Sequence, residues 1–348
     1  MYINDSSILL RKVINLNIFK FNRVGIIVMN LTKSLLKFSL LSVIVFSSAT
    51  LRAGEKIDET LTAKADGRVS IDVMTGVVTI KSWDKNEVRV VGELDDQADG
   101  YQFESNSNRV IFKVEMPEQR WGNWKDSSAA LTFYVPKQSD LRFEGVNVSI
   151  DVEGIVGSSR INTVNGNISA SDLKKRINLE TVNGRIKSRD LDGAITLSTV
   201  NGKVDDKNSQ GEMEVSTVNG DINIETTAQD LSIDNVNGDM NLMLRGVPDA
   251  EINTVNGDVK LDYSYDKKGK VYISTVGGEV DLYVPASISG RFQIETHTGG
   301  DIVNKLTSKQ SKKNRYGPGE SLEFETAGAL IKFDMNTVNG DISILKKD

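Results

Sequence analysis

A row of charged side chains recurs at one fixed place in a repeated motif. Thr-Val-Asn-Gly and its variants recur through residues 145–340, and the position just after each glycine changes from amide to basic to acidic along the chain. In chain order this position holds Asn167, Arg185, Lys203, Asp221, Asp239, Asp258, Glu279, Asp301 and Asp341. If equivalent residues stack, the five carboxylates from Asp221 to Asp301 form one column, and neighbours repel by about 1 kcal/mol per pair even in bulk water. Cations, lateral basic side chains or raised carboxylate pKa values would each relieve this repulsion.

The acidic column predicts a stripe that attracts cations. Ca²⁺ prefers clustered oxygen ligands, so the candidate metal ligands are Asp221, Asp239, Asp258, Glu279 and Asp301. The alternative is that aspartate suits the residue after a tight turn and points into water. A calcium β-roll requires a Gly-Gly-x-Gly-x-Asp nonapeptide twice per coil, whereas each repeat here carries one Asn-Gly, which argues against that class.

Basic and aromatic side chains supply a second group of candidates, for ligand binding. Trp121 and Trp124 lie in the segment RWGNWK, residues 120–125, and could stack on sugar rings, insert at a membrane surface or pack onto their own domain. Arg185 and Lys203 belong to the early repeats. We name these four residues as candidate ligand-binding residues.

Two further basic features are weaker candidates. The single histidine, His297, is interpreted as a replacement for the threonine of the repeat rather than as a ligand. A basic run could contact anionic lipid or polysaccharide, although a solvated loop is the simpler interpretation; it comprises Lys305, Lys309, Lys312, Lys313 and Arg315.

The alternative to a binding surface is an enzyme of the parallel β-helix kind, a polysaccharide lyase or hydrolase. Such an enzyme needs carboxylates, alone or with a basic group, in a groove. The early repeats supply Asp151, Arg160, Arg185, Arg189 and Asp190. The chain has no cysteine, which excludes disulfides, thiolate metal sites and a cysteine nucleophile. Because an active site usually interrupts a repeat, the regularity here predicts no catalytic residues.

The spacing of the motif predicts how these side chains are positioned. Counted from Gly145, successive copies start 18, 18, 18, 18, 18, 19, 21 and 22 residues apart, with 40 across the last gap. Apolar residues alternate in short runs that end at Asn-Gly, which indicates short β-strands joined by tight turns. Asn and Gly suit such turns because both tolerate φ > 0.

Two all-β topologies fit this pattern. Asn-Gly between alternating strands is typical of hairpins, which would give an antiparallel meander. A β-solenoid, with one coil of about 18–22 residues per repeat, stacks like residues ~4.8 Å apart. We favour the solenoid because threonine, valine, asparagine and glycine all recur in register, as expected where asparagines form an amide ladder.

The chain divides into four predicted parts. Residues 1–28 are interpreted as an over-long gene start ahead of Met29, and residues 29–53 as a signal peptide with cleavage after Ala49 or Ala53. Residues 54–144 are predicted to form an irregular β-rich cap or the first coils, and residues 145–348 the solenoid, with a loop insertion at 304–320. The apolar run of the leader is too short for a membrane span, so the mature chain is predicted to have none.

Charge restricts the partners. Seven of the 42 basic residues but one of the 48 acidic residues precede residue 54, so the remainder carries a formal charge of −12. Phosphate backbones would repel such a body, which argues against nucleic acid as a partner. An uncapped solenoid end could pair with another copy, but the charged C-terminal residues discourage this, and we expect a monomer.

The sequence also resembles a known family. SWDKNEVRVVGEL at 82–94, LTFYVP at 131–136, its echo DLYVP at 281–285 and the repeated TVNGDI resemble the bacterial putative-adhesin family of β-strand-repeat domains of unknown function. The resemblance covers residues 55–348 and implies a β-solenoid in the cell envelope, with no catalytic residues to carry over. We therefore expect an exported protein of the periplasm or cell surface that binds or scaffolds an envelope or extracellular polysaccharide or protein.

Overall fold

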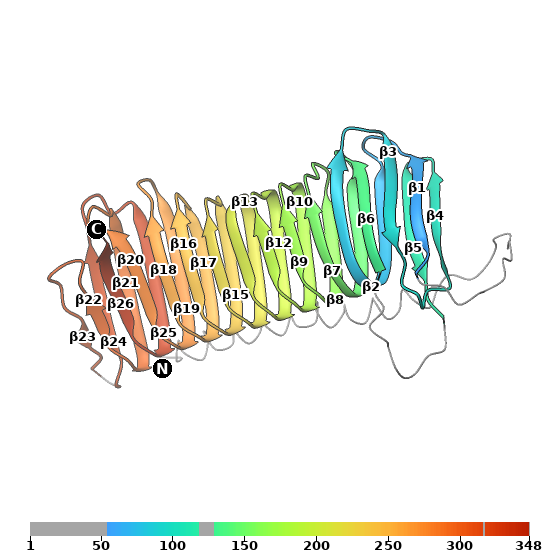
Figure 1. Cartoon of the computed structure of the whole chain (residues 1–348). Helices are drawn as coiled ribbons and strands as arrows, with labels where there is room; N and C mark the ends of the chain where they lie inside the picture. The colour runs from blue at the N-terminus through green and yellow to red at the C-terminus, as the bar shows by residue number, and fades with distance from the viewer. Residues whose placement is uncertain (1–53, 118–128, 316, 348) are drawn as a thin grey trace. The chain divides into compact units, whose positions relative to one another are not determined.

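The computed structural model describes residues 54–117, 129–315 and 317–347, which belong to one compact unit, Ala53–Asp348. The described residues of this unit contain 26 β-strands and no helix, so none of them forms a helix that could cross a membrane. Up to residue 285, consecutive repeats pair as parallel strands in a stack (Figure 1). The predicted all-β solenoid is therefore confirmed, and the hairpin meander is wrong for the repeats.

Each coil contributes one strand to each of two faces. The strand before the Asn-Gly turn belongs to the first face, which consists of β8 (Ser159–Asn165), β10 (Lys174–Asn183), β12 (Asp192–Asn201), the second part of β13 (Val204–Asn219), β15 (Asp230–Asn237), β17 (Asp249–Asn256), β19 (Gly269–Gly277), β25 (Ile331–Asn339) and β21 (Gly290–Gly299). The strand after the turn belongs to the second face, which consists of β9 (Ile168–Ser171), β11 (Ile186–Arg189), the first part of β13, β14 (Ile222–Thr226), β16 (Met240–Arg245), β18 (Val259–Ser264), β20 (Val280–Pro285), β26 (Ile342–Lys347) and β22 (Ile302–Asn304).

The core fills the space between the two faces. Along β10, Ile177, Leu179 and Thr181 are buried, and Ile186 of β11 is buried opposite them. In β12 the equivalent residues pair in register, Ile177 with Ile195 and Leu179 with Leu197. Because the side chains of a strand alternate between faces, the period-two pattern of the sequence places one row inside and the next row on the surface.

The turn glycines are required for two different reasons. In the later turns the backbone is left-handed, as at Gly257, with φ of 146°, which matches the expected conformation. In the earlier turns the reason is close approach: a Cβ on Gly184 would lie 1.9 Å from the carbonyl oxygen of Gly166 in the adjacent coil. None of the turn asparagines adopts φ > 0, so their tolerance of that conformation is not what places them in these turns.

The end of the stack nearest the N-terminus is closed by antiparallel strands. β2 (Arg68–Trp83) and β7 (Asp140–Glu153) run through both faces and pair with each other in parallel. β5 (Arg109–Glu115) and β6 (Ala129–Pro136) extend the two faces beyond β2. β4 (Gly100–Asn106) then pairs antiparallel with β5, while β3 (Glu87–Glu93) pairs antiparallel with β6 and with β1 (Lys56–Thr62).

At the other end the order of the coils differs from their order in the sequence. β25 and β26, the last repeat, lie between the coil of β19 and β20 and the coil of β21 and β22. In Figure 1 the red C-terminal strands accordingly lie among orange ones. Phe333 of β25 stacks on Phe292 of β21 with ring centroids 4.4 Å apart, and Phe292 stacks on Phe324 at 4.5 Å. The last repeat therefore does not form the end of the stack, so its charged residues do not lie where another copy could pair with an open coil.

The segment after β22, which contains the predicted insertion at 304–320 and continues into β24 (Glu320–Glu325), closes this end instead. β24 pairs antiparallel with β21, and β23 (Lys312–Lys313), which carries part of the basic run, pairs with β24. Asn304 donates hydrogen bonds to Thr307 Oγ1 at 2.8 Å and to the Lys309 carbonyl at 3.0 Å. The insertion thus has local hydrogen-bonded structure.

His297 does not occupy the threonine position of its repeat. Thr296 pairs with Thr337 of the last repeat, and the register then shifts before Gly299 pairs with Asn339. His297 therefore lies in a β-bulge, which inserts an extra residue into one strand, and the interpretation that it replaces the threonine is wrong.

Candidate functional site

A ladder of asparagine side chains follows the turn edge of the stack. The Nδ2 of each asparagine donates to the Oδ1 of the asparagine one coil earlier, at distances from 2.7 to 3.1 Å. The ladder comprises Asn147, Asn165, Asn183, Asn201, Asn219, Asn237 and Asn256. The predicted amide ladder is confirmed. Because each interior amide uses one donor and one acceptor within the ladder, this row primarily holds the coils in register.

The row after each glycine is stabilised by the backbone. The Asp239 N–H donates to Asp221 Oδ1 at 3.3 Å, and the Asp258 N–H donates to Asp239 Oδ1 at 3.0 Å. The Glu279 N–H continues the series with Asp258 Oδ1 at 2.8 Å. A backbone N–H donor between successive carboxylates offsets part of their mutual repulsion. The sequence suggests cations, lateral basic side chains and raised pKa values as ways to relieve this repulsion, but not backbone donors.

The carboxylate column also differs in order from the expected one. The pairing of β20, β26 and β22 places Asp341 between Glu279 and Asp301, and the Asp301 N–H donates to Asp341 Oδ1 at 2.8 Å. Within residues 54–117, 129–315 and 317–347, no group of three or more His, Cys, Asp or Glu side chains is arranged to hold a metal ion. The Ca²⁺ stripe stays a prediction.

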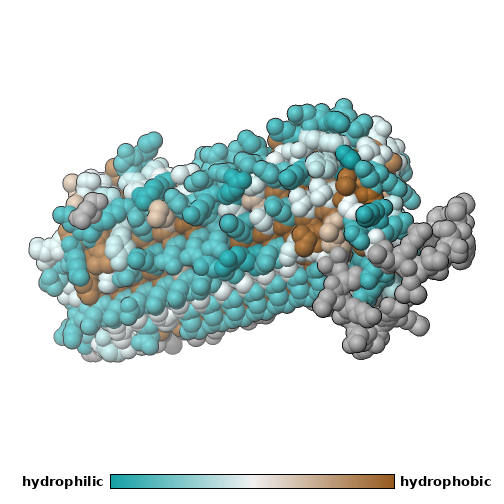
Figure 2. Space-filling view, viewed as in Figure 1, coloured by the Kyte–Doolittle hydropathy of each residue, from teal (hydrophilic) through white to brown (hydrophobic). Residues whose placement is uncertain are grey.

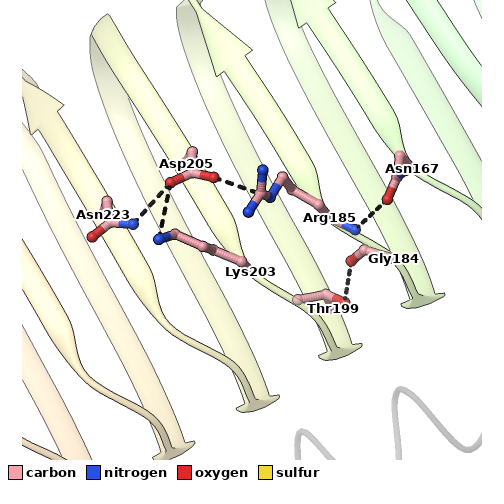
Figure 3. A network of polar contacts seen from close by, with 7 residues as sticks. All are labelled: Asn167, Gly184, Arg185, Thr199, Lys203, Asp205 and Asn223. Carbon is pink, nitrogen blue, oxygen red and sulfur yellow. Dashed lines mark hydrogen bonds and ion pairs between the residues drawn. The ribbon is translucent and has the colours of Figure 1, made fainter.

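Two of the candidate ligand-binding residues converge on one carboxylate of the second face (Figure 3). Arg185 Nε lies 3.4 Å from Asp205 Oδ2, and Lys203 Nζ lies 3.7 Å from Asp205 Oδ1. Asn223 Nδ2 donates to the same Oδ1 at 2.8 Å. The basic groups are therefore partly neutralised, and their place on the surface is fixed by a residue that sequence reasoning missed.

A shallow groove begins at this network and follows the second face along the stack. It has a volume of about 390 Å³ and extends from Asp205 of β13 to Tyr283 of β20 and Lys347 of β26. Its two sides are the outward residues at the third and fifth positions after each repeat glycine, such as Asn223 and Glu225. Figure 2 shows hydrophobic surface between hydrophilic rows along the stack.

Side chains in the groove contact one another from coil to coil. Asn241 Nδ2 donates to Asn223 Oδ1 at 3.3 Å, which continues the series that starts at Asp205. Lys260 Nζ lies over the ring of Tyr283, 5.3 Å from its centroid. Asp262 accepts a hydrogen bond from Lys347 and lies 3.6 Å from Arg245 Nη2. The recurrence of outward residues three positions after each glycine is the signal that could have revealed this surface.

Beneath the groove lies a buried carboxyl group. Asp206 is 1% exposed, in an inward row that holds aliphatic residues in the following coils. Its Oδ1 accepts hydrogen bonds from Ser188 Oγ at 2.6 Å and Ser209 Oγ at 2.7 Å, whereas its Oδ2 is buried and accepts none. Burial raises the pKa of Asp206 to about 6, although the two serine hydrogen bonds oppose that rise.

The remaining candidates are dispersed. Trp121 and Trp124 lie outside the described residues. Among the residues considered for a lyase or hydrolase, Asp151 is on the second face and Arg160 is on the first face. Arg189 pairs with its own neighbour, with Nη1 3.0 Å from Asp190 Oδ2. The structure does not gather these charged groups into one groove.

Comparisons with known proteins identify the fold family. A putative cell adhesion protein from Clostridium sporogenes is 12% identical, with a TM-score of 0.23, over 84% of this chain and 100% of that chain. A putative adhesin from Bacteroides fragilis is 12% identical, with a TM-score of 0.33, over 84% of this chain and 98% of that chain. Similarities at these TM-scores carry no argument about function, and no curated protein matches the chain. The Toastrack DUF4097 family matches residues 67–345, most of the sequence, and its match agrees with the resemblance seen in the repeats. The chain belongs to the Toastrack DUF4097 family.

Proposed function

We propose that the protein is an exported, non-enzymatic binding or scaffolding protein of the bacterial cell envelope, and that its second face is the binding surface. The observation that carries this proposal is the in-register stacking of outward side chains. Hydrogen bonds of 2.7 to 3.1 Å between the asparagine side chains of the ladder hold successive coils in register, so equivalent surface positions recur at one spacing. A surface with this periodicity suits a polymer, because side chains project from it at one spacing along the stack.

The groove gives the second face a defined place for a ligand. Its side chains belong to coils that are connected by parallel strand pairing on both sides, so their positions are set before a ligand arrives. Such preorganisation reduces the conformational entropy that binding costs. At the β13 end of the groove, Asp205 forms ion pairs with both Arg185 and Lys203. Charged groups that are paired in this way suit a role in positioning a ligand rather than in proton transfer.

The test is retention of the full chain on bacterial envelope fractions, with peptidoglycan and surface polysaccharide as separate samples. Each incubation is run with Ca²⁺ and with EDTA, and the supernatants are assayed for newly released sugar ends. Retention without release is the expected result. Release of sugar ends would make the protein a lyase or hydrolase, and an absence of retention on every fraction would refute the binding role.

Export is tested separately on the producing cell. N-terminal sequencing of the mature protein should give a chain that starts after Ala49 or Ala53, recovered from the periplasm or the surface. A mature chain that still begins at Met1 or Met29 would contradict the proposed export.

A further inference from the structure

We infer that the groove on the second face binds a neutral, linear polysaccharide whose chain lies along the stack, across the strands. This inference rests on the proposed binding function and adds the site and the chemical class of the ligand. The groove crosses the strands β13, β14, β16, β18, β20 and β26. At ~4.8 Å per strand this corresponds to about 24 Å of continuous surface, which is enough for several sugar units.

The charge of the groove points to a neutral ligand. Three outward carboxylates, Asp205, Glu225 and Asp262, are balanced by three ammonium groups, Lys207, Lys260 and Lys347. Two of the carboxylates are also paired within the structure, Asp205 with Arg185 and Lys203, and Asp262 with Arg245 and Lys347. Among the outward side chains that line the groove, a strongly anionic or cationic polymer would therefore meet repulsion as well as attraction.

The polar atoms in the middle of the groove match hydroxyl groups. Asn223 and Asn241 project from neighbouring coils and share one hydrogen bond. An amide presents two N–H donors and an acceptor oxygen, and in the part of the chain that the structure describes Asn241 Oδ1 accepts no hydrogen bond. Sugar hydroxyls both donate and accept, so they can use the amide atoms that remain.

The apolar atoms at one end of the groove match the faces of sugar rings. Tyr283 and Met243 line the groove and are half-buried. A tyrosine ring offers a flat apolar surface with a polar tip, which can pack against the C–H groups of a pyranose. Met243 supplies a second apolar contact two strands away, with Asp262 of β18 between the two side chains in the same row.

A polypeptide fits the groove less well. Peptides that bind sheets usually add a strand to a free edge and use its backbone groups. On the floor of this groove the backbone groups of β14, β16 and β18 already pair with the strands on both sides. Only side chains remain for recognition, which favours a ligand whose own periphery is rich in hydroxyl groups.

The experiment is affinity electrophoresis of the full chain in gels that contain one polysaccharide each. The panel consists of a linear neutral β-glucan, a linear neutral mannan, anionic polygalacturonate and cationic chitosan. We expect retardation by a neutral polymer, unchanged between low and moderate salt, because counterion release contributes little to a neutral contact. In that gel the double variant Asn223→Ala/Asn241→Ala and the single variant Tyr283→Ala should each weaken binding at least tenfold.

Two controls distinguish a binding role from a structural one. Lys187→Ala removes an outward side chain of the same face in β11, outside the groove, and should bind like the wild type. Tyr283→Phe keeps the ring and should retain most of the affinity. Every variant is checked for an unchanged thermal transition, and one that unfolds early is replaced by Asn223→Ser/Asn241→Ser or by Tyr283→Leu.

The outcomes separate this inference from the proposed function. Retention on envelope fractions without binding to either neutral polymer would overturn the ligand class and leave the binding function intact. Binding to a neutral polymer that the groove variants do not weaken would overturn the site. Preferential binding to polygalacturonate or chitosan would overturn the argument from charge, and an absence of binding to polymers and envelope fractions alike would overturn both proposals.

Discussion

The buried carboxyl group of Asp206 predicts an unusual pH dependence of stability, which the substitution Asp206→Asn should remove. The pKa of Asp206 is raised from 3.8 to about 6, chiefly by burial and further by the nearby Asp190. Each pKa unit corresponds to about 1.4 kcal/mol, so the shift corresponds to about 3 kcal/mol. The folded state holds this proton more tightly than the unfolded state. The stabilisation is therefore complete below pH 3.8 and is lost as the pH rises to about 6.

An asparagine at this position has no proton to lose. Its Oδ1 can accept the hydrogen bonds that Ser188 and Ser209 now donate to Asp206 Oδ1. At pH 4 the variant and the wild type should therefore differ by less than about 1 kcal/mol. At pH 8 the variant should be more stable by about 3 kcal/mol, because the wild type must hold a charge in a site where its Oδ2 has no partner.

The measurement is hydrogen exchange of the backbone amides of β11, β13 and β14, with wild type and variant compared at each pH between 4 and 8. A local readout is preferable because coils of a solenoid can open separately. Asp230→Asn, the same chemical change on an exposed side chain of β15, is the matched control and should show no such pH-dependent gain. A difference between wild type and Asp206→Asn that is constant from pH 4 to pH 8 would refute the reasoning, as would a variant that is less stable at pH 8.

Three further predictions concern the stack itself. Gly202→Ala should lower the free energy of unfolding by about 3 kcal/mol or more, because its Cβ would lie 1.9 Å from the Gly184 carbonyl oxygen; Gly277→Ala, whose nearest atom is 3.5 Å away, should be nearly neutral in the same thermal melts. Asn201→Ala removes two hydrogen bonds of the ladder and should lower the free energy of unfolding by about 2 kcal/mol in urea titrations. Asn256→Ala removes one such hydrogen bond and should lower it by about 1 kcal/mol. Equal losses for the two variants would contradict a ladder role. Phe333→Ala should lower the free energy of unfolding by about 3 to 5 kcal/mol, because the ring of Phe333 stacks on Phe292 of the adjacent coil. The same variant should be cleaved faster by proteases within 305–320. Unchanged cleavage would show that β25 does not anchor that end.

The rows of the solenoid could be predicted from the sequence because the motif is held at a constant spacing. With a spacing of 18, Asn183 must lie next to Asn165 and Asn201, and the structure places it there. The surface residues Asn223 and Asn241 obey the same spacing, but they look like ordinary solvent-facing residues in the sequence. The recurrence indicates a surface row, but that these residues line one groove with Asp205 and Tyr283 is seen only in the stack.

Two other features could not be read from local patterns. Asp206 belongs to the polar segment DDKNSQ, which resembles a loop, and its burial follows from the inward phase of β13. The position of the last repeat depends on which coils pair with each other. The strands β19, β21 and β25 have the same alternation of buried and outward residues, so this pattern does not show which of them are neighbours. Alternation fixes which side of a strand is buried but does not determine its neighbours.

The interleaved position of β25 and β26 also determines how this fold can assemble. A solenoid whose coils follow the order of the sequence can grow from one end as a zipper, with each coil docking onto its predecessor. Here β21 and β22 find their parallel neighbours in strands that come later in the sequence, so that docking must await a loop closure of about 40 residues, which slows folding. A premature pairing of β21 with β19 would have to break before β25 could insert between them. While folding is incomplete, the unpaired edge of β19 could instead pair with the corresponding coil of another copy. The rate-limiting step of folding should accordingly lie at this end of the stack, far from the regular coils that dominate its surface.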